Sequence, residues 1–357
     1  MKKFLFIAAM ASVALVSCVK NEVIPVNEEG QEISFMTAPV TKADPSFSTS
    51  NKFISYAYLV TGTDALKPWA SNSSSSTPYI ENKLIQYHPA SGTSSAKWAH
   101  ASEVYYWPKD QYSQLTFFAW ADGTNDPAGT AKPVATCSKT TGVKFENYDI
   151  TETANKNRDI MVAKIAADKR ANETATGGTW ADGVPTVFQH ILSSFDTKIK
   201  LNDTYTGVKF YLKSIDLLNV DTKNTYTQGV DATKEPKSNG WGTPSEPETV
   251  SIYLGTMEVN STSEQNIVET GYTILMPQTF AASAEQIKIV YEVVTHYAGT
   301  EVTETVTVVK DLVDMYTSGW AAGSAYTLTI TLGLNQILWD PSVAAWDTTT
   351  GADWAIN

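Results

Sequence analysis

Tyr326-Thr327-Leu328-Thr329-Ile330-Thr331-Leu332 alternates apolar residues with threonine along its whole length. Side chains at positions i and i+2 share one face of a strand, so this segment predicts a strand that packs one face on a core. Ile287–Val293 alternates in the same way, and β-branched residues dominate Val302–Val309. The remaining segments with strand periodicity are Ile33–Ala38, Phe53–Val60, Leu115–Trp120, Val187–Leu201, Val208–Val220 and Val250–Leu254.

Residues typical of turns separate these segments, for example Asp122-Gly123-Thr124-Asn125. The clearest helical candidate is Asn155–Arg170, but its apolar residues do not form one stripe, so we expect a strand and a turn there. Many strands without alternating helices predict an all-β fold built of sandwiches rather than a parallel α/β sheet.

The composition excludes several classes of protein. The chain has 357 residues, enough for one large or two ordinary domains. Its net charge is −12 at pH 7, so it lacks the basic surface that would neutralise phosphates, and no nucleic-acid partner is expected. With only two cysteines the chain can form neither a disulfide scaffold nor a cysteine zinc site.

The first residues read as a secretory signal. Lys2 and Lys3 precede the apolar stretch Phe4–Val16, which is too short for a permanent membrane helix. The stretch ends in a sequence that resembles a bacterial lipobox, with Cys18 at the acylated position. We therefore expect residues 1–17 to be removed, a lipid on Cys18 and a flexible tether over residues 18–30. The alternative is ordinary signal cleavage nearby, with Cys18 incidental.

A search for catalytic or metal-binding motifs finds none. The histidines His88, His100, His190 and His296 lie far apart and form no ligand motif. We expect His190 to be a partly buried, hydrogen-bonded structural residue and Cys137 to be an inert thiol. The chain contains no Gly-x-Ser-x-Gly motif. The sequence therefore predicts no enzyme activity, no cofactor and no metal.

Eight short motifs follow the tether in order. They are Ile33–Phe35, Val40–Ala43, Tyr105–Pro108, Leu115–Trp120, Asp159–Ala163, Val187–Ser193, Leu275–Gln278 and Trp320–Tyr326. Each motif alone is weak, but together they cover nearly all of the chain beyond the tether. In this order they resemble the fimbrillin (Mfa-like) family of Bacteroidales surface lipoproteins, the subunits of type V pili.

That resemblance implies two tandem transthyretin-like β-sandwich domains, which we place at residues 31–202 and 203–357. It also implies a structural role in cell adhesion, as a pilus subunit delivered to the outer membrane through its lipid. In the family, a trypsin-like protease removes the N-terminal strand. An extended segment of the next pilus subunit then fills the groove that the strand has left.

The residues allow a physical account of such a removable strand, which we expect at residues 31–42. Lys42 is the only basic residue between Lys20 and Lys52, so a tryptic cut falls between Lys42 and Ala43. The cut would disconnect Ile33 and Phe35, whose burial contributes roughly 1.5–3 kcal/mol each. It would also leave an unpaired sheet edge that can accept a strand from another chain.

The predicted donor is the tail at residues 335–357. Its apolar residues include Ile337, Trp339, Val343 and Trp346, and Pro341 interrupts any single long strand. The alternative is that Lys42 is one exposed lysine in a loop and that the tail completes the fold of its own chain.

Two readings from other classes stay open. The first is a monomeric surface lipoprotein that binds glycans through the tryptophans of turn-rich stretches, Trp69, Trp98, Trp180 and Trp241. The second is a surface hydrolase, which would need two carboxylates about 5 to 10 Å apart in a cleft.

Overall fold

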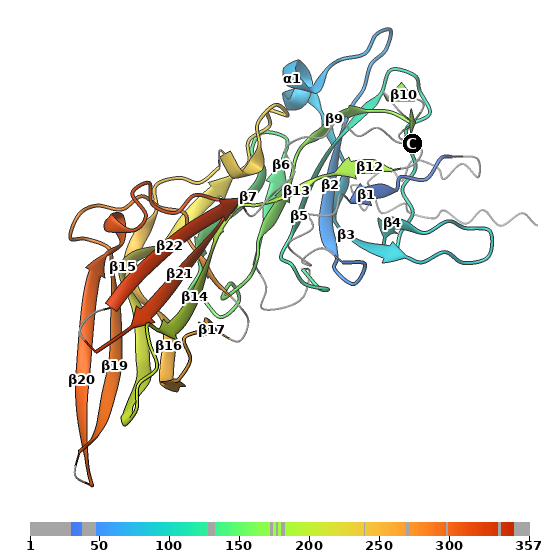
Figure 1. Cartoon of the computed structure of the whole chain (residues 1–357). Coiled ribbons are helices and arrows are strands. Elements are labelled where there is room, and N and C mark those ends of the chain that lie inside the picture. The colour runs from blue at the N-terminus through green and yellow to red at the C-terminus, as the bar shows by residue number, and fades with distance from the viewer. Residues whose placement is uncertain are drawn as a thin grey trace, which may run out of the picture. The chain divides into compact units, whose positions relative to one another are not determined.

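The structure is a computed structural model of the whole chain (Figure 1). It describes residues 30–37, 48–127, 133–171, 174–175, 178–179, 183–238, 240–268, 272–297, 299–334 and 337–345. Over these residues the fold is all-β, as the sequence predicted, and the single α-helix, α1, is the short segment Trp69–Asn72. The 3-10 turns are η1 (Ser73–Ser75), η3 (Pro236–Ser238) and η4 (Leu312–Asp314).

The largest sheet in the described part of the chain has nine strands, all within residues 35–190. Its strand order is β12-β1-β4-β3-β2-β5-β8-β13, and β9 pairs with β5. The strands are β1 (Phe35–Thr37), β2 (Phe53–Val60), β3 (Thr77–His88), β4 (Lys97–His100), β5 (Gln114–Ala121), β8 (Met161–Ala163), β9 (Ala166–Lys169), β12 (Val184–Thr186) and β13 (Phe188–His190).

Two further sheets hold most of the second half. One has the order β20-β19-β15-β7-β6, and β16 pairs with β15. The other has the order β17-β14-β21-β22, and β18 pairs with β14. Their strands are β6 (Thr136–Ser138), β7 (Gly142–Asp149), β14 (Ser193–Leu201), β15 (Val208–Thr227), β16 (Ser245–Val259), β17 (Gln265–Asn266), β18 (Thr273–Leu275), β19 (Gln286–Tyr297), β20 (Thr300–Asp311), β21 (Ser324–Leu332) and β22 (Ile337–Ala345), and a small hairpin joins β10 (Thr174–Ala175) to β11 (Gly178–Thr179).

The alternating segment that predicted the fold is β21. Tyr326, Leu328 and Ile330 are buried on one face, as the periodicity requires. The segment Val187–Leu201 was expected to be one strand, and this was wrong. It forms β13 and β14, which the buried pair Ile191 and Leu192 separates, because β13 pairs with β8 whereas β14 pairs in parallel with β21.

The strands β2 and β5 separate two apolar cores. Phe53 and Ala57 of β2 point into one core, which also contains Ile33 and Phe35. Ile54, Tyr56 and Tyr58 point into the other, which extends to Leu328 and Ile330 of β21. Strands buried on both faces read as continuous apolar runs, which explains why neither β2 nor β5 alternates in polarity.

The strand pairing crosses the boundary that we placed between residues 202 and 203. β7, from the first half, pairs with β15, and β14 pairs with β21 from the second half. The second core likewise draws on both halves of the chain. The division into two tandem domains at this boundary stays a prediction.

Candidate functional site

The predicted removable segment forms strand β1, which lies between two other strands of the nine-stranded sheet. Phe35–Thr37 runs parallel to β12, with Phe35 opposite Val184. On its other side Phe35 pairs with Trp98 of the antiparallel strand β4. We call the groove that holds β1 its seat. It is formed by the flanking strands β4 and β12 and by the core residues that contact Phe35.

Backbone hydrogen bonds add to the strand pairing that holds this segment in its seat. The Ile33 amide donates to the Tyr105 carbonyl over 2.8 Å, and the Val184 amide donates to the Ser34 carbonyl over 2.8 Å. Trp107 donates to the Gln31 carbonyl over 3.0 Å. The Glu32 carboxylate also pairs with the Lys97 ammonium group at a partly exposed position, where an ion pair contributes at most about 1 kcal/mol.

Two buried side chains place this segment in an apolar core. Ile33 is fully buried and Phe35 is 3% exposed. The Phe35 ring packs edge-on against Phe53, with 5.6 Å between the ring centroids, and against Phe117 at 5.9 Å. Burial therefore confirms that these residues, which we had selected from the strand pattern, belong to the core rather than to the surface.

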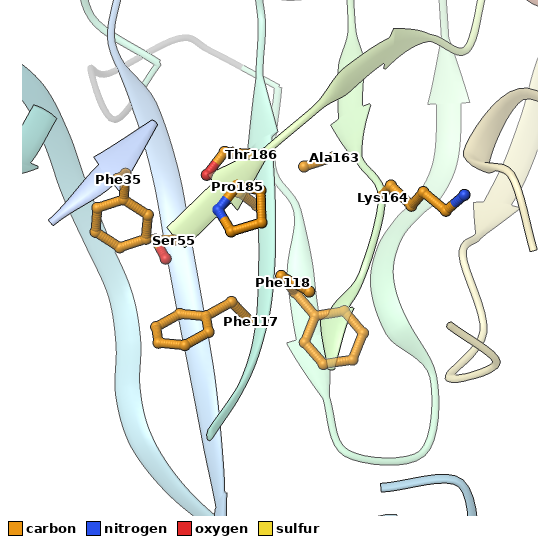
Figure 2. A pocket seen from close by; sticks show the side chains of 10 residues that line it. Phe35, Ser55, Phe117, Phe118, Ala163, Lys164, Pro185 and Thr186 are labelled. Carbon is orange, nitrogen blue, oxygen red and sulfur yellow. The ribbon is translucent and has the colours of Figure 1, made fainter. Parts of the chain in front are cut away.

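The fit of β1 to its seat is close on one side and incomplete on another. A Cβ atom at Gly183 would come within 2.8 Å of the Phe35 carbonyl carbon, so only glycine lets the chain before β12 approach β1 this closely. Beneath Phe35, a cavity of about 10 Å³ remains against Ser55, Phe117 and Pro185 (Figure 2). The seat therefore fits β1 closely, and the remaining space is no larger than one water molecule.

A buried histidine lies against the same ring. His100 of β4 is 6% exposed, its ring centroid is 5.7 Å from that of Phe35, and Tyr105 stacks on it at 4.5 Å. Neither ring nitrogen has a hydrogen-bond partner among the described residues. Burial lowers the pKa of His100 to about 4, although the charge of Glu103 opposes this shift.

This pKa shift predicts a loss of stability in acid. Above about pH 6.5 His100 is neutral in both the folded and the unfolded chain and contributes nothing. As the pH falls from 6.5 to 4, only the unfolded chain takes up the proton, so the free energy of unfolding decreases. His100→Phe should remove about 2.5 kcal/mol of the decrease between pH 7.5 and pH 4.5, measured by denaturant unfolding at both values. An identical pH dependence in the variant and the parent would contradict this assignment.

The other predicted site residues are only partly described. Cys18, Lys42, Ala43 and Trp346 lie outside the described residues. Ile337, Trp339 and Val343 belong to β22, which pairs antiparallel with β21 in the same chain and places Val343 opposite Tyr326. β22 is the last strand of its sheet, and Val343 is 61% exposed.

The tryptophans do not form the exposed platform that the glycan-binding alternative requires. Trp69 is 1% exposed and Trp98 is 8% exposed, and they belong to different cores. Trp241 is half-buried, packs on Tyr226 and donates its ring N–H to the Ile191 carbonyl. Trp180 lies outside the described residues. Three of the four rings are therefore structural, and we withdraw the glycan-binding hypothesis.

The side chains of His190 and Cys137 lie in surroundings that give them a structural rather than a chemical role. His190 is fully buried, and its Nδ1 lies 2.6 Å from an Asp159 carboxylate oxygen, which confirms the expected hydrogen bond. Burial raises the pKa of the Cys137 thiol to about 12, which keeps it protonated and unreactive. Within the described ranges there is no cluster of three or more His, Cys, Asp or Glu side chains suited to a metal ion. The helices of the described residues are too short or too polar to span a membrane.

Two of the sequence motifs meet at one contact in the second core. Gln278 and Trp320 exchange backbone hydrogen bonds of 2.9 and 2.7 Å. The side-chain amide of Gln278 also bonds to the backbone of Asp221. Its Oε1 accepts from the Asp221 N–H at 2.9 Å, and its Nε2 donates to the Asp221 carbonyl at 3.0 Å. Gly319 lies against this pair in a left-handed conformation, with φ +74°. The Leu275–Gln278 and Trp320–Tyr326 motifs therefore join β15 to the start of β21.

Comparison with protein families identifies the family of this chain. The family described as fimbrillin-like matches residues 40–346, which is most of the sequence. The chain belongs to the fimbrillin-like family. No match was found among curated proteins.

Solved structures share the fold of this fimbrillin-like chain at low sequence identity. A fimbrial protein from Bacteroides vulgatus ATCC 8482 is 17% identical and has a TM-score of 0.64, with 88% of this chain and 99% of that chain covered. A putative cell adhesion protein from Bacteroides uniformis ATCC 8492 is 16% identical and has a TM-score of 0.50, with 88% of this chain and 98% of that chain covered.

The sequence did not identify the residues that form the seat in this fimbrillin-like chain. The sequence places Trp98 in a turn-rich stretch and gives no indication of Gly183 or Val184. The available signal was the short apolar pattern of Lys97–His100, in which all residues except Lys97 are buried. Partners so distant in sequence cannot be inferred from periodicity alone.

Proposed function

We propose that this chain is a structural subunit of a cell-surface fimbria and that it assembles by protease-triggered exchange of strand β1. The family supports a fimbrial role, and the short, buried β1 supports the exchange. The observation that carries the proposal is the burial of Ile33 and Phe35 in a segment whose strand, β1, is only three residues long.

The seat has the properties that an acceptor for another strand needs. Loss of β1 would expose the apolar pocket of Ile33 and Phe35, and it would leave β4 and β12 without their common neighbour. A strand from another subunit can satisfy such edges with backbone hydrogen bonds and can fill the pocket with alternate side chains. The partners of this chain are then other fimbrial subunits.

The proposed donor lies within residues 335–357. Because Ile337–Ala345 already pairs with β21, either β22 leaves its own sheet or the residues beyond it enter the seat of the next subunit. Pro341 is tolerated in β22 because this strand lies at the edge of its sheet. Delivery to the outer membrane through a lipid on Cys18 completes the proposal.

Limited digestion with trypsin tests the exchange. We expect a cut after Lys42 to release the segment that contains β1 and to produce oligomers that grow with protein concentration and resist denaturant. Lys52, the next basic residue, is half-buried and its amide donates to the Thr124 carbonyl, which should slow cleavage there. Size-exclusion chromatography with light scattering, together with the mass of the released peptide, provides the readout.

The matched control is Lys42→Gln, which removes the cleavage site and should leave the protein unassembled after the same treatment. Two results would count against the proposal. One is clean release of β1 from a protein that remains monomeric, and the other is complete resistance of the folded protein at Lys42.

A further inference from the structure

The outer edge of β20 is a long, regular strand edge without a neighbour in the described part of the chain. β20 ends its sheet in the strand order and lies beyond β19 (Figure 1). Its twelve residues pair with β19 from Tyr297↔Thr300 to Gln286↔Asp311 without a register shift. We propose that this edge pairs with β20 of a second copy of the chain.

Other sheet edges in the described ranges carry features that oppose such pairing. β16 contains Pro247 and has three register shifts against β15. β22 contains Pro341, and β12 contains Pro185. Proline and bulges block the addition of a further strand. β20 has neither, and Val302 and Val309 are about half exposed on it.

The register with β19 determines which backbone groups of β20 face outward. The His296 amide donates to the Gly207 carbonyl, so the backbone of His296 faces away from β20. Its partner Glu301 therefore directs its own backbone groups away from β19, because narrow and wide pairs alternate in an antiparallel ladder. The outward positions are then the odd-numbered ones, Glu301, Thr303, Thr305, Thr307 and Val309.

An antiparallel pair of β20 strands has one register in which the charges match. With Thr307 on the two-fold axis, Glu304 lies opposite Lys310 of the second copy, and this contact occurs twice by symmetry. The same register places Val306 opposite Val308. These even-numbered residues form the non-hydrogen-bonded pairs, in which side chains are closest.

The adjacent registers are less favourable. With Val306 on the axis, Glu301 would face Asp311, a pair of like charges. With Thr305 on the axis, Glu304 would face Val306 and would have no opposite charge across the strand pair. A charge on an edge strand blocks most partners, but here it selects a second copy in one register.

Sedimentation of the purified, uncut chain at low salt tests this proposal. The Lys42→Gln background excludes protease-triggered assembly, so the result is independent of the proposed function. We expect a monomer–dimer equilibrium with a Kd of about 10–1,000 µM, typical of a small interface. Glu304→Lys and Lys310→Glu should each weaken the dimer about tenfold, and the double variant should regain most of the affinity.

Two further variants make the test specific to the edge. Thr307→Pro removes an outward N–H without removing a hydrogen bond to β19, and it should weaken the dimer at least about 100-fold. Glu258→Lys makes the same charge change on exposed β16 and should have no effect. A chain that stays monomeric up to about 1 mM, or a dimer indifferent to both Glu304→Lys and Thr307→Pro, would overturn the proposal. Circular dichroism verifies that each variant is folded.

Discussion

Phe35→Ala is expected to release β1 from its seat while the rest of the protein stays folded. Removing a buried phenylalanine costs about 3–5 kcal/mol in contact and cavity terms, and β1 has only three residues that pair with neighbouring strands. The Ile33 and Val184 amides report the opening directly, because both donate across the seat. Their hydrogen exchange should accelerate at least about 100-fold, measured by NMR or mass spectrometry.

Met36→Ala is the matched control, since Met36 is on the same strand but only half-buried. It should accelerate the exchange of these amides much less. Amides of β2 should keep their protection in both variants, because β2 lies between the two cores. If the Ile33 amide in the parent protein exchanged only together with the amides of β2, β1 would not be a separable element, and the strand-exchange proposal would lose its basis.

Gly319→Ala should strongly destabilise the second core. The new Cβ would lie 2.1 Å from the Gln278 carbonyl oxygen and 2.6 Å from the Thr279 Cα, and φ is +74°. Backbone atoms cannot move aside without breaking the Gln278–Trp320 pair. We expect a loss of at least about 3 kcal/mol in the free energy of unfolding, measured with denaturant.

Gly299→Ala separates the clash from the backbone strain. Gly299 has φ +83°, but a Cβ there would meet no atom within 4 Å. Only the cost of a left-handed alanine remains, roughly 1–2 kcal/mol. Equal losses of unfolding free energy in the two variants would show that the clash with Gln278 does not contribute to the effect.

The local sequence pattern predicted the strands well where a continuous apolar run or a regular alternation determined them. The bounds of β2 agree with the predicted Phe53–Val60, because a run in which every residue except Ser55 is apolar or aromatic fits a strand buried on both faces. β21 and β19 follow from their alternation. The segment Asn155–Arg170 is not a helix, and the structure forms turns followed by β8 and β9 there.

Long-range pairing lies beyond what these patterns contain. The division of Val187–Leu201 into two strands depends on partners about 30 and 130 residues away in the sequence. The seat of β1 combines β4 and β12, and nothing in the sequence of Phe35–Thr37 indicates either one. Ile33 and Phe35 could be selected because strand periodicity marks a core face, whereas their partners required the fold.

The orientation of β1 limits the kind of assembly that its seat can support. Any strand that occupies the seat in the same register must run parallel to β12 and antiparallel to β4, as β1 does. Each junction then joins two different surfaces of the subunit. Such a junction cannot have the two-fold symmetry of an interface that uses the same surface on both subunits. Repetition of such a head-to-tail step generates an open helical filament unless the rotation closes a ring. That filament has two unlike ends, and one of them carries an empty seat.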